Sequence, residues 1–248
     1  MPKKRITPKN RGAALPETPA FSLSIIIPVY NEEDEIYPCL RRLQSLRKLG
    51  AEVIVVDGGS SDKTISLAKP LADQVIDSDK GRALQMNAGA SKASHDWLLF
   101  LHADTQLPEG LPDLMLAWNF APAVWGFFGV KVRNAPPLLR IVELFMNRRS
   151  YMSGISTGDQ CQFVQRKVFE KIGGFAQLPI MEDIEISKRL KRVSRPLFVR
   201  AKVTTSGRKW QREGIVKTVL LMWRLRLAYF FGVSPSVLEK RYYHSQNK

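Results

Sequence analysis

Three carboxylates in the first half of the chain each follow a short apolar run: Glu32, Asp57 and Asp104. If those runs are neighbouring strands of one parallel sheet, their carboxyl ends meet at one edge and the three acids converge there. Converging carboxylates raise one another's pKa unless a cation or a hydrogen-bond donor is near. A base with N–H groups, a ribose and a divalent metal would supply that compensation. The alternative for each acid taken singly is that it caps a helix.

The apolar pattern around these acids alternates between β-branched runs and amphipathic stretches. It predicts strands at 23–29, 53–56, 75–76 and 97–101, and helices at 34–49, 62–71 and 82–92. Strands that alternate with helices of this length indicate an α/β fold with a mostly parallel central sheet flanked by helices. In such a sheet, ligands bind at the carboxyl ends of the strands, where the three acids lie.

After Thr105 the alternation becomes irregular. We expect strands at 126–132 and 162–165, helices at 138–149, 182–193 and 215–231, a helical turn at 167–172, and a pair of short strands or a hairpin at 196–203. The chain has no internal repeat and no linker that would separate a second domain. We therefore expect one domain over 22–235, with tails at 1–21 and 236–248. The first tail is basic, rich in proline and without an apolar run, which predicts a disordered arm rather than a signal peptide.

Composition and charge narrow the class of protein. Of the 248 residues, 44% are hydrophobic, which is enough for a core, and 38 Lys and Arg against 23 Asp and Glu give a net charge of +15. Residues 21–130 carry nine basic and fourteen acidic side chains, whereas residues 131–248 carry 24 and eight. A nucleic-acid coat protein would not usually place an acidic half beside a basic one. An enzyme for a metal–phosphate substrate, or one that lies on an anionic membrane, fits this distribution.

The cysteines and the length of the apolar runs indicate the cellular compartment. Cys39 and Cys161 show neither metal-ligand spacing nor a framework of bridges, which favours a reducing cytosol. No apolar run is long enough to span a membrane. We therefore expect a cytoplasmic protein.

Five segments carry a resemblance to a known family. The runs SIIIPVYNEEDEI, VIVVDGGSSDKT, KGRALQMNAGA and FLHADTQLPEG resemble the family 2 glycosyltransferases of the GT-A fold. The segment GDQCQFVQRKVFEKIGGF, followed by LPIMEDIEISKRLKR, resembles the subfamily called radical-SAM/selenodomain-associated transferase 2. The resemblance covers about residues 22–235. It implies a GT-A domain with a nucleotide-binding half at 22–105, an acceptor half at 106–205 and a C-terminal loop and helix at 206–235.

The resemblance assigns the nucleotide to the first strand ends. Pro28, Tyr30 and Glu32 would line the base, and Asp57 would accept its imide N–H, since a short charged acceptor suits the N3–H of uracil. Arg82 would reach the base or the phosphates unless it is a solvated helix residue. Asn87 lies about a turn and a half further along the helix and is expected to orient a loop.

The metal motif of the family is Asp-x-Asp, and this chain departs from it by reading His102-Ala103-Asp104. Asp104 would coordinate Mg²⁺ or Mn²⁺ through oxygen. His102 would bond the ribose, add a nitrogen ligand that favours Mn²⁺, or simply pack. The resemblance thus implies a divalent cofactor of open identity.

The resemblance assigns the chemical step to an acidic pair at the start of a helix. Asp183 would be the general base that removes the proton of the acceptor hydroxyl, with Glu182 as its partner. Acidic residues in a first turn also suit the helix dipole, so capping is the alternative. Asp159 would bind sugar hydroxyls on the acceptor side or belong to an ordinary turn.

A basic run further along would meet the charge of the leaving diphosphate. Its candidate residues are Arg208, Trp210 and Arg212, and surface solvation is the alternative. The apolar and basic helix at 215–231 would pack on the domain, form a homodimer, or lie at an anionic membrane surface. A lipid-linked acceptor and a peripheral place on the inner face of the cytoplasmic membrane would fit the last case.

These features together predict an inverting transferase that uses a nucleotide-diphosphate sugar, most simply a UDP-sugar, and an unknown acceptor hydroxyl. A nucleotidyltransferase of similar architecture is the first alternative, although its Gly-rich basic phosphate loop is missing after the first strand, which ends in PVYNEED. A non-catalytic basic binding protein is the second, but nucleic acid is not an expected partner because the candidate cleft is acidic.

Overall fold

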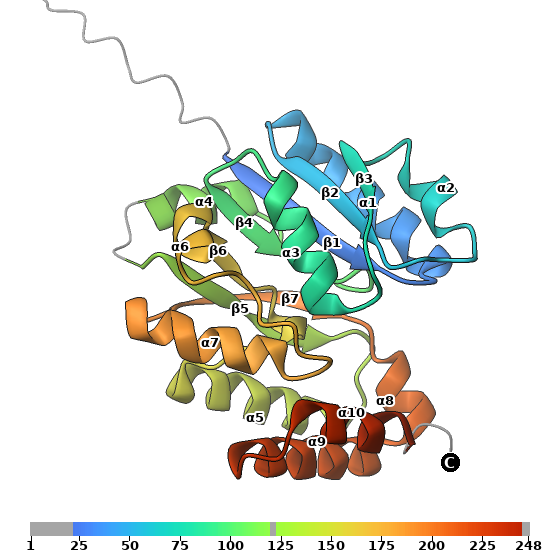
Figure 1. Ribbon diagram of the computed structural model, residues 1–248, viewed down its shortest axis with the longest axis vertical. Helices are drawn as coiled ribbons and strands as arrows, with labels where there is room; N and C mark the ends of the chain where they lie inside the picture. Colours follow the sequence, from blue (N-terminus) through green and yellow to red (C-terminus); the bar gives the residue numbers. More distant parts are fainter. Residues whose placement is uncertain (1–21, 120–122, 245–248) are drawn as a thin grey trace, which may run out of the picture.

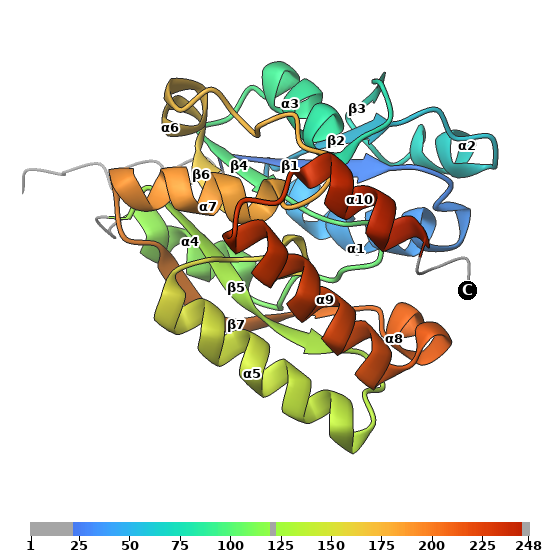
Figure 2. The ribbon, with the colours of Figure 1, turned by 60° about the horizontal axis from the view of Figure 1, so that its bottom comes forward.

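The computed structural model describes residues 22–119 and 123–244. The tail expected at 1–21 lies outside these ranges, as do residues 245–248. Figures 1 and 2 show helices on both faces of one central sheet, with the C-terminal helices gathered at one end of the molecule.

One seven-stranded sheet, in the order β3-β2-β1-β4-β6-β5-β7, forms the centre of the molecule. The strands are β1 (Leu23–Val29), β2 (Glu52–Asp57), β3 (Gln74–Asp77), β4 (Trp97–Phe100), β5 (Trp125–Val132), β6 (Phe163–Gln165) and β7 (Leu197–Thr205). The first four pair in parallel, and β7 pairs in parallel with β5. Only β6 runs antiparallel to its neighbours within this sheet. The prediction of a mostly parallel sheet flanked by helices is confirmed.

Ten α-helices and one 3₁₀ turn occur in the described ranges. They are α1 (Glu33–Lys48), α2 (Thr64–Ala68), α3 (Arg82–Lys92), α4 (Leu111–Asn119), α5 (Pro137–Ser153), η1 (Gly158–Gln160), α6 (Arg166–Lys171), α7 (Glu182–Val193), α8 (Arg208–Glu213), α9 (Ile215–Phe230) and α10 (Pro235–His244). Charge placement stabilises α1 and α7, whose first turns are acidic and whose last turns are basic. In α7, acidic residues fill the first turn, basic residues fill the last, and Arg189 pairs with Glu185 at 2.6 Å.

The core consists of two layers separated by the sheet. Alternate residues of β1 face opposite layers, as the pleat requires: Ile25 and Ile27 pack with α1, while Ile26 packs with α3. All seven residues of β1 are buried, which explains its continuous apolar run. Because β2, β1 and β4 are neighbours in the sheet and run in parallel, their carboxyl ends lie side by side at one edge.

Two expectations about the C-terminal half are wrong. Residues 197–203 belong to a single strand, β7, which begins just after Pro196, and they form no hairpin; the register of β7 against β5 shifts between Phe128 and Gly129. That irregularity interrupts the pattern that suggested two short strands. The tail expected at 236–248 is mostly helical, because α10 extends to His244 and buries Leu238 against α9. Helix α4 was not anticipated.

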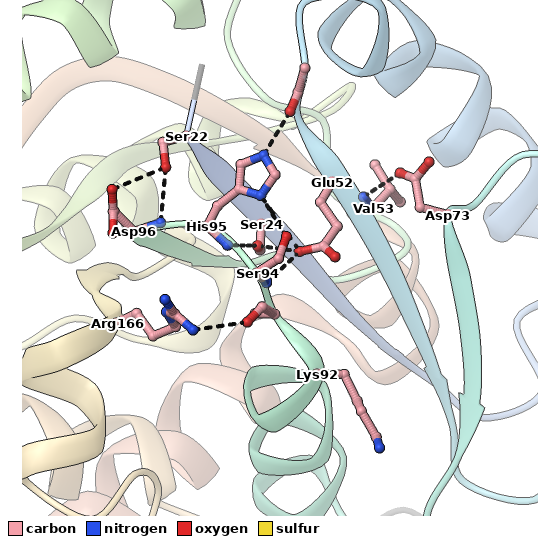
Figure 3. Close-up of polar contacts among 12 residues, drawn as sticks. Ser22, Ser24, Glu52, Val53, Asp73, Lys92, Ser94, His95, Asp96 and Arg166 are labelled. Carbon is pink, nitrogen blue, oxygen red and sulfur yellow. Dashed lines mark hydrogen bonds and ion pairs between the residues drawn. The ribbon is translucent and has the colours of Figure 1, made fainter. Parts of the chain in front are cut away.

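The amino-terminal edge of the sheet is fixed by a polar network that has no part in the predicted site (Figure 3). Ser24 donates to Glu52 Oε2 at 2.5 Å, and the backbone N–H of Ser94 donates to the same oxygen at 2.9 Å. His95 Nε2 lies 2.9 Å from the Gly50 carbonyl. These bonds join β1, β2 and the connection into β4, so Ser, His and Glu side chains gather here for a structural purpose.

Candidate functional site

The turn after β2 is built around Asp57. Its Oδ2 accepts the backbone N–H groups of Gly59 (2.9 Å) and Ser60 (2.8 Å), and its Oδ1 accepts the Ser60 hydroxyl. Ser60 Oγ also accepts the N–H of Asn31, which ties this turn to the turn after β1. Asp57 is thus buried and oriented by its own loop, at the edge where a base was predicted to bind.

Gln85 of α3 braces the same two strand ends. Its Nε2 donates to the carbonyl of Val29 at 2.7 Å and to that of Val56 at 2.9 Å, and its side chain is buried. The sequence analysis did not single out Gln85. A polar residue on the buried side of a helix that follows a strand end is the signal that would have found it.

Tyr30 offers a partly exposed ring beside this turn. The ammonium of Lys80 lies 3.7 Å from its ring centroid, a cation–π contact that also places a positive charge at the nucleotide edge. Pro28 lies inside β1, in register with Val56, and is buried. Of the predicted base-lining residues, Tyr30 therefore presents an exposed aromatic ring with Lys80 over it, whereas Pro28 is buried.

Glu32 and Asp104 converge as the strand order requires. Burial, followed by the charge of Asp104, raises the pKa of Glu32 to about 7, while the guanidinium of Arg208 opposes the shift. Arg208 pairs with Glu35 at 2.9 Å, so the start of α8 reaches the nucleotide side. Asp104 Oδ1 accepts the Thr105 hydroxyl at 3.0 Å.

The residues around Asp104 fit a cation that is shared with a ligand rather than enclosed by protein. In the described ranges no three His, Cys, Asp or Glu side chains group as a metal cage. Divalent cations in phosphate sites are commonly held by one or two carboxylates plus the substrate phosphates. The repulsion between Glu32 and Asp104 is the feature that a cation or hydrogen-bond donor would relieve.

His102 connects the nucleotide edge to the predicted acceptor side. Its Nδ1 lies 3.8 Å from Asp159 Oδ1. Burial, together with the nearby Arg82, lowers the pKa of His102, so the ring is neutral near pH 7. Gly158 leaves room for that ring, since a Cβ on Gly158 would lie 2.7 Å from His102 Cε1.

The acidic pair begins α7, directly after Met181, whose φ of 68° is left-handed. Asp183 Oδ2 accepts the Gly158 N–H at 3.0 Å, and burial raises the pKa of Asp183. Glu182 Oε1 lies 3.2 Å from Arg82 Nε. Its Oε2 is buried without a hydrogen-bond partner among the described residues, and burial raises the pKa of Glu182 to about 7.

A small cavity joins the two halves of the site. It is lined by Met86, Phe100, His102, Gly158, Gln162, Phe175, Glu182 and Asp183. The predicted orienting role of Asn87 is confirmed: its amide donates to the Phe175 carbonyl at 2.8 Å and accepts the Phe175 N–H at 2.9 Å. The arrangement places two buried carboxylates with raised pKa, that of Glu182 being about 7, beside the strand ends that would hold a nucleotide.

Two residues that interact with the charged groups of the site were missed by the sequence analysis. Arg149, near the end of α5, interacts electrostatically with Asp183 and Asp159. Tyr242 of α10 does the same with Arg82, which places the C-terminal helix near the acidic pair. Both come from helices far away in the sequence, so no local motif pointed to them.

The remaining basic-run residues are not gathered at the cavity. Arg212 is 78% exposed and lies 3.4 Å from its neighbour Glu213. Trp210 is half-buried on α8. Of the three phosphate-side candidates, only Arg208 reaches an acid of the nucleotide edge.

Comparison with known proteins gives a family match that spans the nucleotide half and part of the acceptor half. The family described as "Glycosyl transferase family 2" matches residues 24–173. Among curated proteins, the poly-beta-1,6-N-acetyl-D-glucosamine synthase of Staphylococcus aureus (strain MSSA476) is 28% identical over 214 residues, covering 83% of this chain and 46% of the synthase. The chain thus spans about half the length of that relative.

Solved structures share the fold at low identity. The mannosyltransferase PcManGT from Pyrobaculum calidifontis, in complex with GDP-Man and Mn²⁺, has a TM-score of 0.58 at 20% identity, covering 84% of this chain and 61% of that one. S. aureus TarS 1-349 in complex with UDP-GlcNAc has a TM-score of 0.62 at 19% identity, covering 75% and 58%. The chain has the GT-A fold of these enzymes.

Proposed function

Because the chain belongs to glycosyl transferase family 2, we propose that it is an inverting enzyme that moves a sugar from a nucleotide-diphosphate donor, a UDP-sugar, to an acceptor hydroxyl. The observation that carries this proposal is the shared cavity. His102 from the nucleotide half and the Glu182–Asp183 pair from the acceptor half line the same small space.

In this proposal the donor binds at the ends of β1, β2 and β4. Asp57 accepts an N–H of the base, and its orientation is already fixed by the Gly59 and Ser60 amides. Tyr30 stacks on the base, with Lys80 on its ring. His102, held neutral by burial, meets the ribose as a hydrogen-bond partner.

Asp183 is the general base for the acceptor hydroxyl. Its raised pKa makes it a stronger proton acceptor than an ordinary aspartate, and the Gly158 N–H orients its Oδ2. Glu182 bonds Arg82 beside the acceptor, and with a pKa of about 7 it carries a second negative charge only in part near neutral pH. Asp159 and Arg149 lie on the same side, where they would bind polar groups of the acceptor.

Asp104 would hold the divalent cation, Mg²⁺ or Mn²⁺. The Glu32 carboxylate, which interacts electrostatically with Asp104, would also be stabilised by the cation. When bound, the cation neutralises charge on the departing diphosphate. The nucleotide sugars in PcManGT and TarS, and the Mn²⁺ in PcManGT, support a nucleotide-sugar donor and a metal for this chain without deciding between UDP and GDP or between Mn²⁺ and Mg²⁺.

We also propose that the protein acts in the cytoplasm at the inner face of the membrane, on a lipid-linked acceptor. The basic second half of the chain supports this placement. None of the helices in the described ranges is long and apolar enough to cross a bilayer.

Calorimetric titration of UDP, GDP, CDP and ADP, each with Mn²⁺ and with EDTA, tests the donor site. We expect one pyrimidine diphosphate to bind only with metal, and we expect Asp104→Asn and Asp57→Ala to lose that binding. The matched control is Asp96→Asn, at the opposite edge of the sheet (Figure 3), which should bind as wild type does. Failure of every nucleotide to bind wild type would overturn the proposal.

Replacing the base separates binding from chemistry. Asp183→Asn should bind the donor with unchanged affinity but release its nucleoside diphosphate about 10²–10⁴-fold more slowly, with water as acceptor, because the carboxylate that takes the proton is gone. Nucleoside diphosphate release can be followed with a coupled assay. Equal rates in the two proteins would exclude Asp183 as the base.

A further inference from the structure

Helix α9 exposes an unbroken apolar stripe. Its members recur at spacings of four and three residues, and their exposed fractions lie between 57% and 76%: Val216, Leu220, Trp223, Leu227 and Phe230. That spacing places them on one side of a helix. Phe231, just past the end of α9, is also 74% exposed.

The stripe is not required for the fold, because another side of α9 makes the packing contacts. Leu225 is buried against Ile180 and Met181, the residues that precede the acidic pair, and against Leu238 of α10. Thr218 is also buried. Helix α9 therefore has one apolar side turned to the protein and another turned to solvent.

Helix α5 carries a second exposed stripe. Leu138, Ile141, Phe145 and Met152 share one side at spacings of three, four and seven residues, with exposed fractions from 47% to 73%. The buried Leu139 lies on its protein-facing side, where α5 contacts β5. Helices α5 and α9 are in contact, and both views show them side by side at one end of the molecule (Figures 1 and 2).

The charges on these two helices are almost all positive. Together α5 and α9 hold six basic residues and one acidic residue, Glu143. Glu143 is buried and pairs with Arg140 at 2.9 Å, so it adds little negative charge to the exterior. Arg148, Lys217 and Arg224 are exposed beside the stripes.

Apolar stripes flanked by cations match the interface of an anionic bilayer, in which apolar side chains enter the acyl boundary and cations meet lipid phosphates. A second copy of this chain is a poorer occupant, because a two-fold interface would bring the same cations against one another. Neither helix is long and apolar enough to span a membrane within the described ranges.

We propose that α5 and α9 together form a docking surface for an anionic lipid bilayer, with both helices lying along the membrane plane. The surface adjoins the acceptor side of the site, since α9 packs on Met181 and Arg149 of α5 interacts with Asp183. Delivery of the acceptor from the bilayer rests on the proposed function; docking itself does not.

Co-sedimentation of the full chain with vesicles tests this surface, using phosphatidylcholine alone and phosphatidylcholine with roughly one-third phosphatidylglycerol. We expect binding only to the anionic vesicles. The apolar variant Trp223→Ser/Leu227→Ser and the charge variant Lys217→Glu/Arg224→Glu should each weaken the vesicle partition coefficient about tenfold or more. A blue shift of tryptophan fluorescence on vesicle binding should be smaller in the first variant.

The matched control is Tyr37→Ser/Leu49→Ser, which removes two exposed apolar side chains of the α1 region and should leave binding unchanged. Circular dichroism checks that each variant is folded. The proposal would be overturned if wild type did not sediment with anionic vesicles, or if the apolar variant and the charge variant both bound them as wild type does. It would also be overturned by a dimer in ultracentrifugation that these two variants dissociate. Binding is measured without donor, so a chain that binds vesicles but no nucleotide would overturn only the proposed function.

Discussion

At the scale of single residues, Glu182 gives the clearest pH signature. Burial raises its pKa from 4.5 to about 7 in the folded protein, so the folded state holds a proton that the unfolded chain releases. Its contribution to stability is therefore full below about pH 4.5 and is lost as the pH rises through 7. The loss amounts to at most about 3 kcal/mol.

Glu182→Gln should remove this loss, because the amide stays neutral at every pH. We expect wild type and variant to be similarly stable near pH 4.5 and the variant to be about 2–3 kcal/mol more stable at pH 8. Urea unfolding across the pH range measures both. Asp183 contributes in the same direction in both proteins, but its charge is one of the causes of the raised Glu182 pKa, so the difference between the two curves reports the coupled pair. Parallel stability curves would contradict the expectation.

Gly158 is expected to be intolerant of a side chain. A Cβ there would lie 2.7 Å from His102 Cε1, so Gly158→Ala should cost about 1–3 kcal/mol by overpacking and displace the N–H that orients Asp183. Adding His102→Ala should recover most of that loss, because the clashing ring is gone. Thermal unfolding of the two single variants and the double variant measures the coupling, and strictly additive losses would show that the clash is not with His102.

At the scale of elements, α10 depends on a small cluster of its own. Leu238 is buried with Leu225, Ile180 and Met181, apart from the two main core layers. Leu238→Ala should therefore raise amide exchange in α9, α10 and the segment before α7, while β1, β2 and β4 keep wild-type protection. Hydrogen exchange followed by mass spectrometry distinguishes this from a global loss, in which exchange would rise everywhere.

Elements with a strong local pattern were predicted from the sequence, and elements that depend on distant contacts were not. The strands β1, β2 and β4 and the helix α7 were predicted because each has a strong pattern: a continuous buried run, or apolar spacing with acids first and bases last. Of the α10 side chains that the structure describes, only Leu238 is buried, which leaves too few apolar positions for a period to stand out. The irregular pairing of β7 with β5 depends on a partner distant in the chain, which no local pattern encodes.

The site residues also fall into those that the sequence predicted and those that only tertiary packing brings to the site. Glu32, Asp57 and Asp104 were predicted because parallel strands bring their ends together, and the structure places them at that edge. Arg149 and Tyr242 reach the acidic pair only through the packing of α5 and α10, and the exposed stripe of α5 has the same spacing as a buried one. Whether such a stripe faces the core is decided by tertiary structure.

At the scale of the whole molecule, the question is whether the two halves unfold as one unit. The sheet continues from β4 through β6 to β5, so no boundary separates the nucleotide half from the acceptor half. Cys39 of α1 and Cys161 after η1 belong to the same core layer. Both thiols are buried, and burial raises their pKa, that of Cys39 to about 12.

A single cooperative domain predicts that the two thiols become reactive in the same event. The variants Cys39→Ala and Cys161→Ala each leave one thiol to report, and an aromatic disulfide reagent in excess measures how fast each is exposed. We expect equal labelling rates once each rate is corrected for the stability of its own variant, with both rising together in urea. A Cys161 that reacts much faster than Cys39 would mean that the acceptor half opens alone, and the single domain predicted for 22–235 would then be two.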